Sequence, residues 1–129
     1  MRYRANYALL EFGEHLGPHE QGLDVPWATF VGDRSSEQRF HVPVGDPVDS
    51  YLELQAYEVD SFGHDIRLNG EPLSGFDIPP ANGWQYWMDA ITGAELVKGE
   101  NTVQVIRDPE AQDSFVVGNV TVHWREPLS

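Results

Sequence analysis

Aromatic side chains gather in one short segment of the chain, where they could bind a ligand. Trp84, Tyr86 and Trp87 follow a loop predicted for residues 79–83, and Asp89 comes just after them. Trp and Tyr rings stack on the flat C–H faces of sugar rings, while a carboxylate such as that of Asp89 accepts hydrogen bonds from sugar hydroxyls. This segment is therefore the first candidate site, and it favours carbohydrate as the ligand class.

The alternative for each of these rings is a place in the hydrophobic core. Alternate side chains of a strand point to opposite faces, so Trp84 and Tyr86 share one face and Trp87 takes the other. One of these faces must be buried, and for Trp84 or Trp87 taken singly an interior position is the more common outcome. For Trp27 and Trp124 the interior is favoured still more strongly.

A second candidate site flanks a turn predicted for residues 61–63. Asp60 and His64 stand on either side of this turn, where an exposed loop can present them to a ligand. Asp60 together with Asp65 also has the residue types that glycoside hydrolysis needs. However, the chain contains 21 Asp and Glu residues, so such carboxylate pairs arise by chance. We rank this turn after the Trp84 segment.

Imidazole and carboxylate groups also lie close together in the sequence at His15, His19 and Glu20. Such groups bind zinc and other transition metals, and this set would suit a small cupin-like metal-dependent enzyme. The cupin pattern, however, has paired histidines on one strand, and the Gly-Pro pair at residues 17–18 breaks a strand here. We therefore expect exposed loop histidines, with a metal site as the weaker alternative.

Other catalytic motifs are missing from the sequence. The chain has no cysteine and no Gly-x-Ser-x-Gly elbow, so the usual activated nucleophiles are absent. It also lacks the Gly-x-x-x-x-Gly-Lys motif that cradles phosphates. We therefore expect a binding module rather than an enzyme, with no catalytic residue and no cofactor assigned.

The charge balance is strongly acidic. Against 21 Asp and Glu stand 8 Lys and Arg, which gives a formal net charge of −13, and Lys98 is the only lysine. Such a surface repels nucleic acid phosphates and anionic membranes, so neither is an expected partner. The pattern is typical of extremely halophilic archaea, because at about 1 M salt the Debye length falls to near 3 Å and the repulsion is screened. We expect a halophilic archaeal protein whose partner is a saccharide or another protein.

Chain length and hydropathy indicate one domain that covers residues 1–129. A chain of 129 residues is long enough to bury a single core without disulfides. No apolar run approaches the roughly 20 residues of a bilayer span. Glu11 interrupts the first apolar run before it reaches signal-peptide length. We therefore expect a cytoplasmic protein.

Alternating apolar and polar residues predict the strands that must position these candidate sites. Leu52, Leu54 and Ala56, for example, fall on one face of a strand with Glu53 and Gln55 between them. Clusters of Gly, Pro, Asp and Asn separate eight such runs. The predicted strands cover residues 6–12, 27–31, 39–44, 51–59, 64–68, 84–88, 102–106 and 114–124.

Many short strands at this spacing predict an all-β antiparallel sandwich or barrel. In the closing strand, Val120, Val122 and Trp124 share one face, which we expect to be buried. Helix is predicted only as a single turn near residues 93–98, ending at Gly99, a residue type suited to a left-handed cap.

This succession of elements resembles the galactose-binding-like jelly-roll family, whose sandwich is shared by many carbohydrate-binding modules. The matching pieces are the long strand 51–59, Ile-Arg-Leu-Asn-Gly at 66–70, Leu-x-x-Gly-x-Asn-x-Val at 96–103 and the closing strand 115–124. The resemblance covers roughly residues 48–126. It implies a β-sandwich of jelly-roll type and a carbohydrate-binding role, although its motifs are structural and recur in domains with unrelated ligands.

In that family the segment before Val48 holds the first strands and often part of a calcium site. The resemblance therefore implies a structural calcium ion, but no residue of this segment matches a ligand position, so none is assigned. Three functions remain open at this point. They are a non-enzymatic carbohydrate-binding module, a cupin-like metal-dependent enzyme, and an assembly protein that binds a partner chain.

Overall fold

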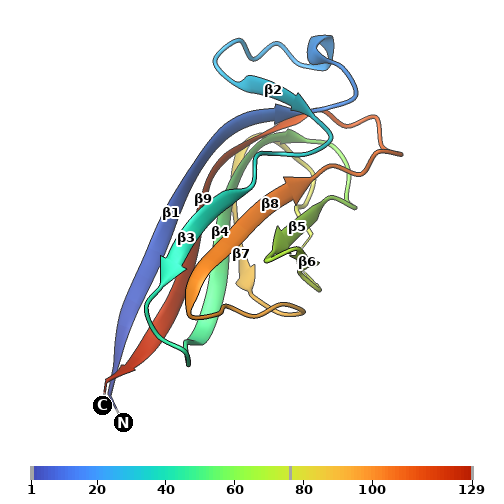
Figure 1. The fold of residues 1–129 in the computed structure, drawn as a ribbon. Helices are drawn as coiled ribbons and strands as arrows, with labels where there is room; N and C mark the ends of the chain where they lie inside the picture. Colours follow the sequence, from blue (N-terminus) through green and yellow to red (C-terminus); the bar gives the residue numbers. More distant parts are fainter. Residues whose placement is uncertain (1, 76, 129) are drawn as a thin grey trace.

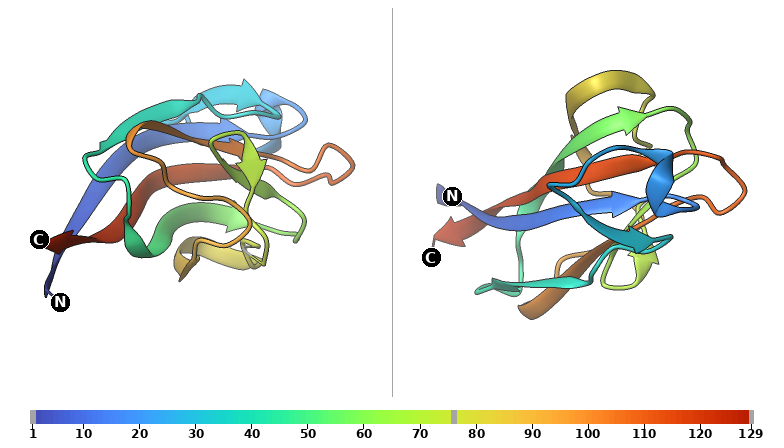
Figure 2. Two further views of the ribbon diagram at one scale, coloured as in Figure 1. Left: turned by 60° about the horizontal axis from the view of Figure 1, so that its bottom comes forward. Right: turned by 90° about the horizontal axis from the view of Figure 1, so that it is seen from above.

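Two β-sheets pack face to face in the computed structural model, which describes residues 2–75 and 77–128 (Figures 1 and 2). The five-stranded sheet has the order β2-β1-β9-β4-β7, and the four-stranded sheet has the order β3-β8-β5-β6. This confirms the predicted all-β sandwich. The elements are β1 (Arg2–Leu16), η1 (Glu20–Gly22, a 3-10 turn), β2 (Thr29–Gly32), β3 (Gln38–Val42), β4 (Val48–Val59), β5 (Asp65–Leu68), β6 (Glu71–Pro72), β7 (Ala81–Ala90), β8 (Gly99–Ile106) and β9 (Phe115–Leu128).

Strands β1 and β9 run side by side through the middle of the larger sheet. They pair antiparallel from Arg2 opposite Leu128 to Leu16 opposite Phe115, so the two ends of the chain lie together (Figure 1). Strand β4 pairs with the other side of β9, and β7 pairs with β4. One pair departs from the expected antiparallel arrangement, because β2 runs parallel to β1. No helix among the described residues is long and apolar enough to cross a membrane.

The core lies between the sheets and is built from alternate residues of each strand. Leu52, Leu54 and Ala56 of β4 are fully buried. The predicted inner face of β9 is also buried, and Trp124 lies in the core as expected. Since alternate side chains of a strand point to opposite faces, Glu53, Gln55 and Tyr57 of β4 lie on the outer face of the larger sheet.

The two motifs that carry the family resemblance meet in the structure. Asn69 and Gly70 both have positive φ angles, 54° and 81°, and form the tight turn between β5 and β6. The Asn69 amide donates to Asn101 Oδ1 at 2.9 Å, and Thr102 N–H donates to Asn69 Oδ1 at 2.8 Å. The β5–β6 turn is therefore tied to the start of β8.

The predicted helical turn near residues 93–98 is wrong. Asn101 is fully buried, and its side chain binds the main chain of Val97 at both the N–H (2.9 Å) and the C=O (2.8 Å). These bonds keep the segment from forming a helical turn, because a helix would need the same groups. The 3-10 turn lies instead at Glu20–Gly22. All eight predicted strands are present, and the prediction missed only β6, which is two residues long.

Candidate ligand-binding face

Three aromatic rings from separate segments meet on the outer face of the larger sheet. Tyr57 of β4 and Trp84 of β7 are direct cross-strand partners, with ring centroids 5.2 Å apart. Trp27, from the loop before β2, lies 5.7 Å from Tyr57 and 5.8 Å from Trp84. Although the rings touch one another, Trp27 is 57% exposed and Trp84 is 53% exposed. We call these three residues the aromatic triad.

A glycine on β9 gives the Trp84 indole its position. A Cβ atom built on Gly118 would lie 3.0 Å from Trp84 Cζ3 and 3.3 Å from Gln55 Cβ. The indole therefore reaches across β4 as far as β9. It occupies space that is open because residue 118 has no side chain. The ring rests on the sheet instead of standing free in solvent.

The exposed face continues along β7 beyond the triad. Tyr86 and Met88 are both more than half exposed and follow Trp84 at two-residue intervals. Two shallow hollows lie along this pair of strands. One, of about 260 Å³, is lined by Gln55, Trp84, Gln85 and Tyr86, and the other, of about 350 Å³, is lined by Tyr51, Met88, Asp89 and Ala90.

Glu53 supplies a polar centre between these hollows. Its carboxylate contacts His123 Nε2 of β9, and its hydrogen bond with the Tyr86 hydroxyl raises the pKa of that phenol. The Tyr51 ring stacks on His123 with centroids 4.4 Å apart and planes tilted by 8°. Tyr7 of β1 lies on the other side of the imidazole, at 6.2 Å. Hydrogen-bonding groups therefore alternate with aromatic rings along the face.

The structure divides the first candidate site between two faces of β7. Trp84 and Tyr86 share the exposed face, whereas Trp87 is partly buried and packs against the core. Asp89 shares its face with Trp87, and its carboxylate accepts a hydrogen bond from the N–H of the next residue at 2.8 Å. The expectation that Trp27 fills the core is wrong, because the loop that carries it folds over the outer face of the sheet.

The second candidate site forms an internal clasp. His64 is 2% exposed, and its Nε2 lies 2.8 Å from Asp113 Oδ2 while its Nδ1 accepts the Asp108 N–H at 3.0 Å. The imidazole therefore donates from Nε2, and both ring nitrogens are engaged. Asp113 also accepts the N–H groups of Asp60 and Ser61 at 3.1 and 3.2 Å. Burial raises the pKa of Asp113, but these hydrogen bonds outweigh it and hold that pKa below its usual value.

The clasp leaves little for a ligand to bind. The Asp60 side chain is exposed, but the structure uses its main-chain N–H rather than its carboxylate. A ligand role for Asp60 and His64 stays a prediction, and the contacts support a structural role, namely joining the β4–β5 turn to residues 108–113.

The possible metal ligands near residue 15 are not assembled. His15 lies on β1, is buried against Phe30, and has a pKa lowered by burial and partly restored by Glu20. His15 is therefore not the exposed loop residue that we expected, whereas His19 and Glu20 are exposed. Across residues 2–75 and 77–128, no three His, Cys, Asp or Glu side chains lie close enough to hold a metal ion. The calcium ion implied by the family resemblance therefore finds no such ligand set here.

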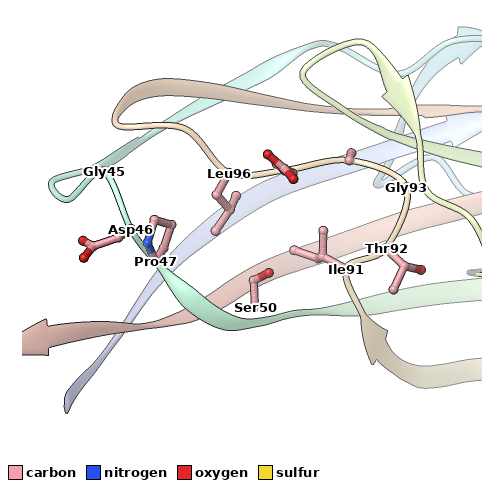
Figure 3. Close-up of a pocket in the computed structure, with 10 residues that line it drawn as sticks. Gly45, Asp46, Pro47, Ser50, Ile91, Thr92, Gly93 and Leu96 are labelled. Atoms are coloured by element: carbon pink, nitrogen blue, oxygen red, sulfur yellow. The ribbon is translucent and has the colours of Figure 1, made fainter. Parts of the chain in front are cut away.

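A larger hollow lies elsewhere, at one end of the sandwich (Figure 3). It measures about 740 Å³ and lies between residues 45–50 and the segment 91–96 that follows β7. Its described lining includes the carboxylates of Asp46 and Glu95 and the hydroxyls of Ser50 and Thr92, but no aromatic ring and no basic side chain. The hollow with the greater volume is therefore not the one with aromatic side chains. We favour the aromatic face, because its rings and polar groups can recognise a ligand.

Sequence reasoning missed several residues of this face. Tyr51 and Tyr57 could have been found, because they occupy the positions of β4 that alternate with the buried Leu52, Leu54 and Ala56. Trp27 and Gly118 carry no such signal, since each meets Trp84 only through the tertiary fold.

The fold is a two-sheet β-sandwich similar to that of carbohydrate-binding modules. The CBM36-1 domain of a multidomain xylanase from the hindgut metagenome of Trinervitermes trinervoides has a TM-score of 0.58 at 11% identity, over 96% of this chain and 99% of that domain. The GH26-CBM35 β-(1,4)-mannanase of Podospora anserina gives 0.52 at 12% identity, over 95% of this chain and 28% of that protein. Dimeric latent PorU from Porphyromonas gingivalis gives 0.57 at 11% identity, over 99% of this chain and 13% of that protein.

The chain itself belongs to a family of unknown function, DUF7383, whose model matches residues 4–126. No curated protein matches the chain significantly. At these identities the similarity to solved structures shows the fold alone.

Proposed function

We propose that this domain is a non-enzymatic module that binds an uncharged carbohydrate on the outer face of its five-stranded sheet. The observation that carries the proposal is the aromatic triad. Trp27, Tyr57 and Trp84 lie within 5.2–5.8 Å of one another, and both tryptophans remain more than half exposed. Large exposed rings held in place by the sheet match the flat C–H faces of a sugar ring.

Groups that can bind sugar hydroxyls lie next to the triad. Gln55 and Tyr86 line the hollow beside Trp84, and Glu53 interacts with Tyr86. The second hollow follows along the same strands, beside Tyr51. From Tyr51 to Tyr57 the face extends roughly 20 Å at about 3.3 Å per residue. This length supports a ligand of several sugar units that lies along β4 and β7.

The charge of the chain supports an uncharged ligand. A net charge of −13 opposes the approach of acidic polysaccharides. Stacking on aromatic rings, by contrast, is not weakened by salt, because burial of apolar surface depends little on charge screening. The acidic composition therefore also supports a protein that works at molar salt. The solved structures that resemble this chain add carbohydrate-binding modules as an analogy, at 11–12% identity.

Isothermal titration calorimetry in molar KCl tests the proposal. The ligands are neutral xylo-, manno- and cello-oligosaccharides of increasing length, with oligogalacturonate as an anionic comparison. We expect at least one neutral series to bind, and Trp84→Ala to lower its affinity at least tenfold, or about 1.4 kcal/mol.

A matched control is Phe62→Ala, which removes a side chain that is 58% exposed in the β4–β5 turn, outside the triad. This variant should bind like the unmodified chain. If no oligosaccharide of the panel binds, or if both substitutions lower affinity equally, the proposal fails.

A further inference from the structure

Strand β7 forms one edge of the larger sheet, and no other strand of the described chain pairs with its free side. On its inner side the Ile91 N–H, just past the strand, donates to the Ser50 carbonyl at 3.1 Å. In an antiparallel pair, main-chain groups point alternately toward and away from the neighbouring strand. The residues of β7 whose main-chain N–H and C=O groups point to the free edge are therefore Trp84, Tyr86, Met88 and Ala90.

The other sheet edges are short or carry exposed basic side chains. Strand β2 covers β1 only at residues 14–16, and the uncovered part of β1 carries the exposed Arg2 and Arg4. Strand β2 has four residues, and β6 has two, one of them Pro72. Strand β3 has five residues and presents Arg39, whose side chain is 72% exposed. Strand β7 has ten residues and contains no Pro, no Lys and no Arg. Its one charged residue, Asp89, is not among the edge-facing residues. A long edge strand without prolines or basic side chains tends to pair with another strand.

We infer that β7 pairs antiparallel with β7 of a second copy of this chain. Because the free groups belong to alternate residues, a two-fold axis can place Tyr86 of one copy opposite Met88 of the other, and Trp84 opposite Ala90. In this register every free N–H and C=O of these residues gains a partner. A tyrosine ring next to a methionine sulfur is also a favourable contact.

Charge permits a second copy at this edge and gives a basic partner no advantage there. The molecule carries a net charge of −13, yet all four residues that face the free edge are uncharged. Two like-charged copies can therefore meet at this edge without opposing carboxylates from these residues, and molar salt screens the remaining repulsion. A basic partner would gain nothing from this edge, since its charges would find no acidic group among the edge-facing residues.

The inferred dimer goes beyond the proposed carbohydrate site and does not depend on it. Pairing uses main-chain groups, so the side chains of Trp84 and Tyr86 stay on the sheet face. Two five-stranded sheets would join into one continuous sheet, with an aromatic triad in each half on the same face. Two linked sites would strengthen the binding of a long polymer without any new contact.

Multi-angle light scattering in molar KCl measures the oligomeric state of the full chain. We expect a dimer for the unmodified chain and a monomer for Met88→Lys, because a lysine at the edge opposes strand pairing. His41→Lys, on the β3 edge, is the matched control and should stay dimeric. A monomeric unmodified chain, or a Met88→Lys variant that stays dimeric with an unchanged circular dichroism spectrum, overturns the inference.

A disulfide tests the register and remains informative if Met88→Lys does not fold. The chain has no cysteine, so Tyr86→Cys with Met88→Cys introduces the only thiols. Opposite residues of a hydrogen-bonded pair have Cα atoms about 5.5 Å apart, which a disulfide can bridge. We expect oxidation to give a covalent dimer. The same pair of substitutions at Arg39 and His41 should give none, and equal cross-linking at both edges, or none at β7, contradicts the inferred register.

Discussion

The aromatic triad and the His64–Asp113 clasp both contain residue types that bind ligands, but the fold treats them in opposite ways. In the clasp, both nitrogens of His64 are engaged and Asp113 accepts several hydrogen bonds from the protein. In the triad, Trp27 and Trp84 keep more than half of their surface in solvent. The hydrogen-bonding groups of the clasp are occupied by the protein's own groups, whereas the rings of the triad keep exposed surface that a ligand can contact.

This difference suggests a general way to separate structural from binding residues. A buried polar group must be paired inside the protein, so its hydrogen-bonding capacity is taken up by contacts that stabilise the fold. When an exposed ring is held in place by its neighbours, its solvent-facing side contributes little to the stability of the fold. Substitutions in the clasp should therefore change stability alone, and substitutions in the triad should change affinity alone.

The largest effect is expected for Asp113→Ala. This change leaves the His64 Nε2–H and the Asp60 and Ser61 N–H groups without their acceptor. We expect the free energy of unfolding to fall by about 3–5 kcal/mol, because several buried donors lose their acceptor at a cost of about 1–3 kcal/mol each. Urea denaturation measures this, with Asp60→Ala as the control that keeps the clasp. If the Asp113→Ala variant is as stable as the unmodified chain, the clasp does not have the structural role that distinguishes it from the triad.

Glu126 is a second buried carboxylate whose hydrogen bonds are all made within the protein, and it should make stability depend on pH. Hydrogen bonds from Asn6, Arg4 and Trp124 lower the pKa of this buried carboxyl to about 2 from 4.5. Because the folded-state pKa is depressed, its contribution is complete above pH 4.5 and is lost as the pH falls toward 2.

Glu126→Gln should therefore cost roughly 1–3 kcal/mol at neutral pH and progressively less in acid. Unfolding free energies of both chains, measured across that pH range in urea, give the comparison. A difference that stays constant with pH would mean that the carboxylate charge contributes nothing.

Trp27→Ala should lower the affinity for the ligand and leave stability nearly unchanged, the opposite of what we expect for Asp113→Ala. The indole contacts Tyr57 and Trp84 at the surface but lies outside the core. We expect the affinity for the neutral oligosaccharide to fall about tenfold, or ~1.4 kcal/mol. The free energy of unfolding should change by less than about 1 kcal/mol. Calorimetry and urea denaturation on the same sample measure both quantities. A loss of stability larger than the loss of affinity would place Trp27 with the structural residues.

Gly118→Ala should give the smallest effect. The new methyl group would meet Trp84 Cζ3 at 3.0 Å, so the indole must shift by a few tenths of an ångström. We expect a loss of affinity of about threefold, or roughly 0.6 kcal/mol. Gly45→Ala is a suitable control, because a Cβ atom there meets nothing within 4 Å. If both variants bind like the unmodified chain, the exact position of Trp84 on the sheet does not matter for binding.

Much of the fold could be predicted because its signals are local. Alternation along β4 and β9 identified their buried faces, and the Asn69–Gly70 pair identified a tight turn. Strand β6 was missed because two residues cannot show a period. The segment before Gly99 was predicted helical from its residue types, but the buried Asn101 side chain competes for its main-chain groups.

The candidate site was predictable only in part. Trp84 and Tyr86 were correctly placed on one face of their strand, opposite Trp87. Their neighbours Trp27 and Gly118 lie far away in the sequence and meet Trp84 through the packing of β9, β4 and the loop before β2. No local pattern contains that information.

By itself, the sequence determined the strands, their alternation and the acidic surface, because each of these depends on neighbouring residues or on composition. Only the tertiary structure decided which face of β7 meets the second sheet and which meets solvent. A period of two separates the faces of a strand but does not label them. Packing of the four-stranded sheet covered the Trp87 side, and this left Trp84 and Tyr86 exposed to solvent.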